Sequence, residues 1–284
     1  MKRCKIKIGQ IFTHVFIITM LVLVLLPFYV LIINSLKDQN DIMKDPFAFP
    51  GTAAAPLNPA LITGSYEAAW NLITKYFINT IIIAVAEIVG VILFSSMAAY
   101  GFTRFNFKGR DLLFTVFLGF MMIPGILTLA SQYSLVYSTL GLGKSFWGVI
   151  LPAVAGGMPV NIFLIKTFFA GVPDSLFEAA EIDGASHVRR YVTFALPLCM
   201  PILFTIGLST LMGAWNDVIW ARLILIDTTD AKYTISLGVF ERLDDYTETI
   251  KYAGYVLASL PLVIAFSLTS KQFIKGLTNG AIKM

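Results

Sequence analysis

One glycine-rich stretch and the two histidines are the residues whose types suggest nucleotide binding or catalysis. Gly-Leu-Gly-Lys-Ser at 141–145 has the Lys-Ser end of a phosphate-binding loop, but Ser138 occupies the position of the loop's first glycine and no strand pattern precedes it. His14 and His187 are far apart in the chain, and neither has a nucleophile and an orienting acid nearby in sequence. We therefore predict no catalytic, metal-binding or cofactor-binding site in this chain.

Two acidic residues, Glu87 and Asp217, lie inside long apolar stretches. A charged acid at the centre of a bilayer costs on the order of 3 kcal/mol, so an acid in a membrane span should face protein or water, or stay protonated. Glu87 could line a pore or contact another helix, or it could be a hydrogen-bonded acid inside a helix bundle. Asp217 ends the sequence Trp215-Asn216-Asp217, which could have a functional role or could simply pack.

The elements that carry these residues are apolar enough to cross a membrane. Of the 284 residues, 57% are hydrophobic and 13% charged, which is more apolar surface than a soluble core of this length can bury. A bilayer core about 30 Å thick requires roughly 20 apolar residues per helix. The sequence therefore predicts an all-α polytopic membrane protein with a single transmembrane domain over residues 1–284. Its six predicted spans are 11–33, 77–101, 112–136, 147–169, 199–221 and 252–270.

The distribution of basic residues predicts the orientation in the cell membrane. Six spans place both termini on one side, and 13 of the 21 Lys and Arg residues fall on that side. By the positive-inside rule both termini are cytoplasmic. The first span has no small-residue cleavage site after it and is read as an uncleaved anchor. The net charge of +4 is explained by this bias and by anionic lipid, so no nucleic-acid partner is predicted.

Two long connections are predicted outside the cell. Residues 37–75 are rich in proline, which favours extended segments and turns over helix, and residues 222–251 are the most charged, as expected of a solvated loop. Proline also occurs within four of the spans, which predicts kinked helices around a cavity, with simple packing kinks as the alternative. These prolines are Pro124, Pro152, Pro159, Pro201 and Pro261.

Residues 170–198 form a polar connection on the predicted cytoplasmic side. Ser175 and Glu178 have the spacing of a capping box and Gly184 suits a C-terminal stop, so we predict a helix over 175–183. An isolated helix this short is marginal in water and must pack against something. Its apolar residues could fit a socket on a partner, or could rest on the chain's own helix ends.

The same connection has a Glu-Ala-Ala followed at fixed distances by a glycine and a Leu-Pro pair, at Glu178, Ala179, Ala180, Gly184, Leu196 and Pro197. These residues and spacings resemble the signature of the inner-membrane permease subunits of binding-protein-dependent ABC importers, and Asp183 and Ala185 are as in the carbohydrate-uptake branch. Phe194 stands where the family usually has isoleucine. The stretches AAYGFTRFNFKGRDLL, MMIPG, AWND and KQFIKGLTNGAIKM are similar to the shorter, six-span permease subunit of maltose-type sugar importers, and the resemblance covers roughly residues 10–284.

The resemblance implies a type I ABC importer permease fold, in which the short helix is a coupling helix docked in a cleft of an ATPase. The residues that it assigns to this docking are Glu178, Ala179, Ala180, Asp183, Gly184 and Ala185. It also implies that the segment Trp215, Asn216 and Asp217 borders the translocation path, to which we add Glu87 as a candidate. A second Glu-Ala-Ala at 67–69 lacks the downstream Gly and Leu-Pro and is read as chance.

The implied partners are a second, homologous permease, two cytoplasmic ATPase subunits that hold ATP and Mg²⁺, and an extracytoplasmic binding protein. Residues 37–75 and 222–251 are the expected docking segments for the binding protein, and the tail 272–284 could contact the ATPases. The predicted function is ATP-driven import of a sugar or oligosaccharide. The alternatives are import of a non-sugar solute by the same machinery, or an ion-coupled secondary transporter that uses Glu87 and Asp217.

Overall fold

A computed structural model describes residues 8–52, 55–226 and 230–281, with side chains described from residue 9 to residue 271 outside the same gaps. Within these ranges every element is a helix, and the only strand-like pairing is an isolated bridge between Thr52 and Ala55. The all-α prediction is therefore confirmed for the described residues. The predicted ATPase contacts of the tail 272–284 lie outside the described side chains.

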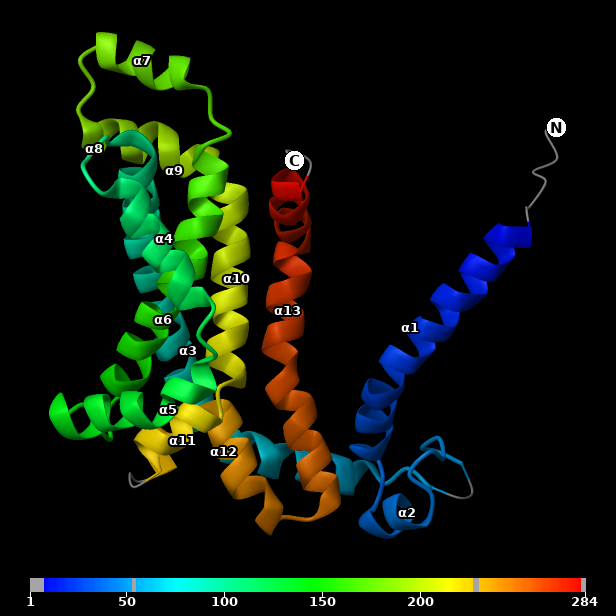
Figure 1. Cartoon of the computed structure of the whole chain (residues 1–284). Coiled ribbons are helices and arrows are strands. Elements are labelled where there is room, and N and C mark those ends of the chain that lie inside the picture. Colours follow the sequence, from blue (N-terminus) through cyan, green and yellow to red (C-terminus); the bar gives the residue numbers. More distant parts are fainter. Residues whose placement is uncertain (1–7, 53–54, 227–229, 282–284) are drawn as a thin grey trace. The chain divides into compact units, whose positions relative to one another are not determined.

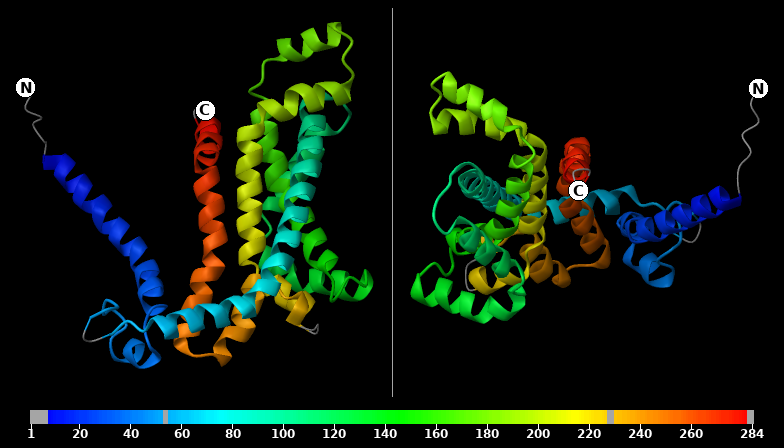
Figure 2. Two further views of the ribbon diagram at one scale, coloured as in Figure 1. Left: turned by 180° about the vertical axis from the view of Figure 1, so that it is seen from behind. Right: turned by 45° about the horizontal axis from the view of Figure 1, so that its top comes forward.

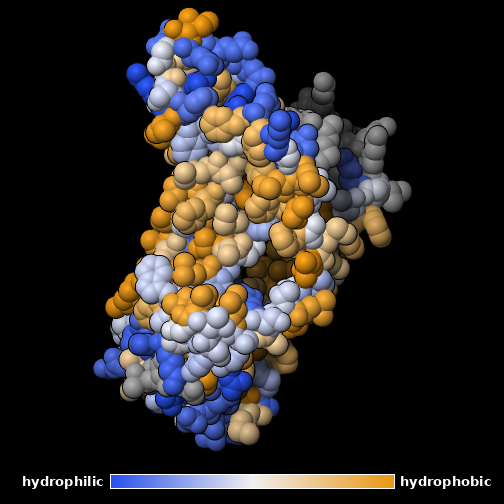
Figure 3. Space-filling view, turned by 60° about the vertical axis from the view of Figure 1, so that its left-hand side comes forward, coloured by the Kyte–Doolittle hydropathy of each residue, from blue (hydrophilic) through white to orange (hydrophobic). Residues whose placement is uncertain are grey.

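Among the described residues, four helices are long and apolar enough to cross a membrane, and two bent helix pairs raise the number of possible spans to six. The four continuous helices are α1 (Ile8–Asn34), α3 (Pro59–Arg104), α6 (Phe146–Phe169) and α13 (Glu248–Ala281). On the face drawn in Figure 3, hydrophobic residues cover the middle and hydrophilic residues cover the two ends, as a bilayer-embedded surface requires.

The first bent pair corresponds to the predicted span 112–136. Here α4 (Arg110–Met121) is followed after a 93° bend by α5 (Gly125–Tyr133) and by η1 (Ser134–Thr139), a π-helical turn. The bend occurs at Pro124, which has no N–H to donate and adopts an extended conformation as the N-cap of α5. The predicted kink at this proline is confirmed.

The second bent pair leads into the predicted span 199–221. Its first arm comprises α8 (His187–Arg190), the π-helical η2 (Tyr191–Ala195) and α9 (Leu196–Leu198), and it meets α10 (Met200–Asn216) at 75°. The span helix therefore ends at Asn216 and not at residue 221, because Asp217 adopts an extended conformation. Residues 219–225 form a separate helix, α11 (Ile219–Leu225).

The segment 37–75, which is predicted to be external, contains more helix than its prolines suggested. α2 (Gln39–Lys44) is helical, and α3 begins at Pro59, so the expectation of extended segments and turns is wrong for residues 59–75. A proline in the first turn costs no hydrogen bond, because the N–H groups there have no intrahelical partner. Asn58 caps this start, since its Oδ1 accepts a hydrogen bond from the Leu61 N–H at 3.2 Å.

The chain divides into two compact units, and the smaller unit comprises Met1–Thr74 with Val239–Leu260. Its centre is Lys37, which is only 1% exposed and whose Nζ donates to Asn34 Oδ1 at 3.1 Å and to the Asp45 carbonyl at 3.2 Å. Burial lowers the pKa of this ammonium group because desolvation penalises its charge. The Lys37 carbonyl accepts a hydrogen bond from Thr249 Oγ1 at 3.0 Å, which ties the end of α1 to the start of α13.

The larger unit comprises Lys75–Gly238 with Pro261–Met284 and contains the helix bundle of α3, α4, α6 and α10 (Figures 1 and 2). Helices α3 and α6 approach closely at Gly90, where an added Cβ would lie 2.8 Å from Val154 Cγ2. The unit also includes α7 (Asp174–Ile182) and η3 (Asp230–Lys232). Helix α12 (Ile235–Arg242) starts in it, and η4 (Leu243–Asp245) belongs to the smaller unit.

Residues 222–226 and 230–238 are packed and do not form the solvated loop that the charge of this segment suggested. Leu225, Ile235 and Leu237 are fully buried. Asn79 Nδ2 on α3 donates to the carbonyls of Ala231 at 2.6 Å and Tyr233 at 3.0 Å. The charged residues thus belong to a segment whose apolar side chains pack inside the larger unit.

Replacement of Gly238 by alanine should destabilise this packed segment. An added Cβ would lie 2.2 Å from the ring of Tyr76, so the ring must move, and overpacking of this kind costs about 1–3 kcal/mol. We expect a lower thermal unfolding temperature for the purified chain in detergent. The matched control is Gly119→Ala, since an added Cβ there meets nothing within 4 Å. Equal stability of the two variants would contradict the packing described.

Candidate functional site

The short polar helix predicted over 175–183 is α7, Asp174–Ile182, at the end of the bundle opposite to α11 (Figures 1 and 2). Its existence is confirmed, but its predicted capping box is wrong. The N-cap is Pro173, no side chain caps the helix, and Ser175 lies inside the first turn. The acidic Asp174 in that turn stabilises the positive end of the helix dipole instead.

The end of α7 is fixed by Gly184, as predicted. Gly184 has φ +76°, a left-handed conformation that glycine adopts without steric cost. Its N–H donates to the Glu181 carbonyl and the Ala185 N–H donates to the Ala180 carbonyl, both at 2.9 Å. These two bonds are a Schellman motif, which satisfies carbonyls at the end of the helix and turns the chain back toward α8.

Arg104, the last residue of α3, holds the first half of α7. Its guanidinium lies over the Phe177 ring, 3.7 Å from the centroid, and it forms an ion pair with Asp174. Phe177 and Ala180 are the buried side chains of α7, each 5% exposed. Helix α7 is therefore packed on its own chain through an apolar face that Arg104 covers.

Arg190 in α8 holds the second half of α7. It is 7% exposed, and its Nη1 donates to Glu181 Oε2 at 2.7 Å. Sequence reasoning counted Arg104 and Arg190 only as cytoplasmic charges and missed these contacts. The available signal was that each arginine ends a helix next to or within the polar connection. The distances along the sequence did not identify the acidic residue with which each arginine pairs.

The opposite side of α7 is open to solvent. Ile182 is 86% exposed and Leu176 is 44% exposed. Of the six predicted docking residues, Ala185 is half-buried and Ala180 is buried. The four that are exposed are Glu178, Ala179, Asp183 and Gly184. The helix thus has one face packed on Arg104 and Phe177 and one face, mixed apolar and acidic, without a partner in the described residues.

Three of the four residues predicted to line a translocation path meet at one cavity of about 410 Å³. Glu87 reaches it from α3, and Asn216 and Asp217 reach it from the end of α10. Asp217 also caps the next helix, because it accepts a hydrogen bond from the Trp220 N–H at 3.0 Å. The other lining residues are Val91, Ala153, Gly157, Thr210, Gly213 and Ala214.

Trp215 is not among the residues that line this cavity. It is 4% exposed and packs edge to face on Phe77 with ring centroids 5.5 Å apart. Its carbonyl accepts a hydrogen bond from the Ser236 hydroxyl. The tryptophan therefore anchors α10 against α3 and the first turn of α12, and the structure does not bring it together with the other three candidates.

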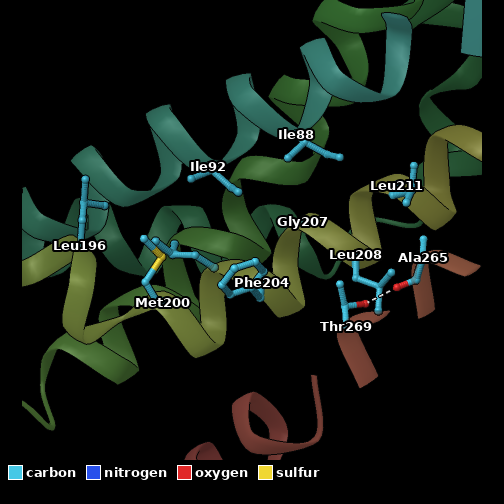
Figure 4. A pocket seen from close by; sticks show the side chains of 11 residues that line it. Ile88, Ile92, Leu196, Met200, Phe204, Gly207, Leu208, Leu211, Ala265 and Thr269 are labelled. Atoms are coloured by element: carbon cyan, nitrogen blue, oxygen red, sulfur yellow. Dashed lines mark hydrogen bonds between the residues drawn. The ribbon is translucent and has the colours of Figure 1, made fainter. Parts of the chain in front are cut away.

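A second cavity, of about 460 Å³, lies between α3, α10 and α13 and is lined by apolar side chains and Thr269. Figure 4 shows Ile88 and Ile92 of α3 on one side and Met200 and Phe204 of α10 on the other. Thr269 Oγ1 donates to the Ala265 carbonyl within α13, at 2.6 Å. This cavity can hold an acyl chain or an apolar side chain, and it offers little to a polar solute.

The residues of 141–145 have local structural roles. The Ser145 side chain caps α6 by accepting from the Gly148 N–H at 3.3 Å, and the Lys144 N–H donates to the Ile224 carbonyl at 2.9 Å. In the described part of the chain, no group of three or more His, Cys, Asp or Glu side chains could hold a metal ion.

A comparison with known families identifies the family of the chain. Residues 90–278 match the family described as binding-protein-dependent transport system inner membrane component, which is well over half of the chain. The chain belongs to this family. It is a membrane-embedded permease, and the family is one of transporter subunits rather than of enzymes.

Individual relatives match about three quarters or more of the permease. It is 31% identical over 284 residues to the probable ABC transporter permease protein YurM of Bacillus subtilis (strain 168), covering 99% of this chain and 91% of that protein. It is 33% identical over 212 residues to the galactooligosaccharides transport system permease protein GanQ of the same strain, covering 74% of each chain.

A solved structure shares the fold of the permease. It is a chain of a bacterial ABC transporter involved in the import of the acidic polysaccharide alginate, with a TM-score of 0.75 and 21% identity over 96% of this chain and 99% of that one. The fold is therefore that of a type I ABC importer permease, as the sequence predicted.

Replacement of Arg104 by alanine should loosen α7 without unfolding the bundle. The variant loses a cation–π contact and an ion pair, so amide hydrogen exchange over 174–182 should accelerate about tenfold. Exchange measured by mass spectrometry on the full permease in detergent tests this. The control is Arg189→Ala, at an exposed neighbouring base, which should leave exchange unchanged. Unaltered protection in R104A would contradict the anchoring role.

Proposed function

We propose that this permease forms, with a second homologous permease, the path by which an ATP-driven importer moves a sugar or oligosaccharide delivered by an extracytoplasmic binding protein. Several similar permeases are named for galactooligosaccharide, arabinooligosaccharide and maltodextrin transport systems. The observation that carries the proposal is the exposed outer face of α7 at one end of the bundle, held by Arg104 and Arg190.

The exposed face of α7 is the proposed contact with the ATPase. Ile182 would insert into an apolar cleft, and burial of such a side chain contributes about 1.5–3 kcal/mol. Glu178 and Asp183 would pair with polar or basic groups at the rim. Ala179 would allow close approach, and buried Ala180 would let α7 lie close to its own support. The two ATPases would hold ATP and Mg²⁺, and this chain would bind neither.

The exposed apolar surface of α1 is suited to contact with lipid or with the second permease. Only 6% of its most apolar window is buried within the chain. Such a surface is stable in a bilayer, against acyl chains or against the second permease. The basic residues near the predicted inner ends of the spans place both termini in the cytoplasm in this proposal.

The binding protein would dock on the outer segments. In 37–75 the apolar side chains of Met43, Phe47 and Phe49 are exposed, at 75%, 58% and 63%. In 222–251 the packed residues up to 238 leave the later part, with exposed Phe240 and Tyr246, as the more available surface. Aromatic side chains of this kind supply contact area at low entropic cost.

In the proposed cycle, ATP binding closes the ATPases and displaces α7, and the displacement passes through Arg104 to α3 and through Arg190 to the arm before α10. The cavity lined by Glu87, Asn216 and Asp217 would then open outward to receive solute, and hydrolysis would return it to the inward-open state.

Co-purification tests the assembly. The tagged permease should purify from its host membrane with an ATPase, and uptake should require ATP. If the permease purifies without any ATPase, and if uptake follows a proton or sodium gradient, the importer proposal is wrong and the ion-coupled alternative is favoured.

Gly184 provides a test of the coupling loop with a built-in control. Gly184→Val should insert normally but lose uptake, because a β-branched residue is strained at φ +76°. Gly184→Asn should retain most uptake, since asparagine tolerates the left-handed region. The measurement is solute uptake normalised to permease in the membrane. Wild-type uptake by G184V would argue against coupling through this loop.

A further inference from the structure

The cavity between α3, α6 and α10 carries acidic groups and no basic group. Glu87 and Asp217 contribute carboxyl groups, Thr210 a hydroxyl and Asn216 an amide, and none of the described residues that line the cavity is Lys, Arg or His. The remaining lining residues are small or apolar. A negatively charged solute in this cavity would therefore meet no cation on its wall.

Glu87 is the residue that makes this cavity unusual. Its side chain lines the cavity although the residue is only 4% exposed, and in the part of the chain that the structure describes its carboxyl has no hydrogen-bond or ion-pair partner. A buried polar group of this kind is costly unless a ligand or water satisfies it. An unpartnered carboxyl that lines a cavity is consistent with a role toward the solute.

The nearest charges of opposite sign on the same helix are far from Glu87. Lys75 and Arg104 are 12 and 17 residues away on α3, which corresponds to roughly 18 Å and 26 Å along the axis. Lys75 is paired with Asp230 and Arg104 with Asp174. Neither base is placed to neutralise the Glu87 carboxyl or to bind an anion beside it.

We propose that this cavity selects the solute by charge, and that Glu87 and Asp217 exclude anionic saccharides while uncharged or cationic ones pass. The proposal rests on the proposed function, since it names the class of saccharide that the same path admits. An ionised carboxylate on the cavity wall repels an anion, so the proposal requires that at least one of the two groups be ionised during transport. A carboxyl, like an amide, also hydrogen-bonds to sugar hydroxyls. The fold alone does not set this charge selectivity, because the similar solved importer takes an acidic polysaccharide.

The test measures the electrostatic potential in the cavity with thiol reagents of different charge. Thr210→Cys places a thiol on the cavity wall in the full permease, assembled in its complex, with Cys4 replaced by serine and the buried Cys199 retained. The probes are the trimethylammonium-ethyl, sulfonatoethyl and uncharged methyl methanethiosulfonates. Each rate is divided by that of the uncharged reagent, and labelling of the parent without the new cysteine is subtracted.

The cationic reagent should react about tenfold faster than the anionic one at Thr210→Cys, and this ratio should approach one in the double variant E87Q/D217N. Both substitutions keep the side-chain shape, and the amide oxygen that D217N introduces can still accept from the Trp220 N–H. The matched control is Gly207→Cys, in the apolar cavity, where the double variant should change nothing. Size-exclusion profiles verify that the variants are folded.

Equal rates for the two charged reagents at Thr210→Cys, or a ratio that persists in E87Q/D217N, would overturn the charge-selection proposal. Neither result depends on whether an ATPase co-purifies, so failure here leaves the importer proposal intact. Conversely, absence of the ATPase would end the importer proposal while the reagent ratio still reports the charge of the cavity.

Discussion

The contact between Arg104 and α7 is the interaction on which the functional interpretation depends. A helix of nine residues does not hold its shape alone in water. Here the guanidinium covers the Phe177 ring and pairs with Asp174, while Arg190 pairs with Glu181 from the other side. The inward face is thereby satisfied within the chain, and the outward face is left available. Without the packed face the short helix would unfold, and without the exposed face it would be buried and unable to contact a partner.

The membrane imposes a second constraint, which applies to the bend at Pro124 and to the end of α10 at Asp217. Backbone polar groups at membrane depth must be satisfied by protein or water. The chain leaves regular helix at Pro124 and at Asp217, where α5 and α11 begin. Asp217 satisfies a backbone N–H of α11 and also lines the polar cavity, so one side chain serves both the break between α10 and α11 and the cavity.

Local sequence signals predicted what depends on local geometry. Gly184 was identifiable because a positive φ at a helix end favours glycine, and the apolar stretches were identifiable by length alone. The capping box failed because Ser-x-x-Glu recurs by chance, and Pro173 takes the cap position instead. The contact of Arg104 with Asp174 joins residues 70 positions apart, and the meeting of Glu87 with Asp217 depends on helix packing. No spacing rule encodes such pairs, and none showed that Trp215 turns into the core.

The two arginines connect α7 to elements of different stiffness. Between Arg104 and Glu87 the chain is one uninterrupted helix, so a displacement at its inner end reaches the cavity with little loss. Between Arg190 and Asp217 the chain has a π-helical turn and a 75° break at Cys199, which can flex under the same displacement. A displacement of α7 would therefore move the wall that carries Glu87 as a rigid body. The wall that carries Asp217 would move with bending at the break, so the cavity would change shape as well as position.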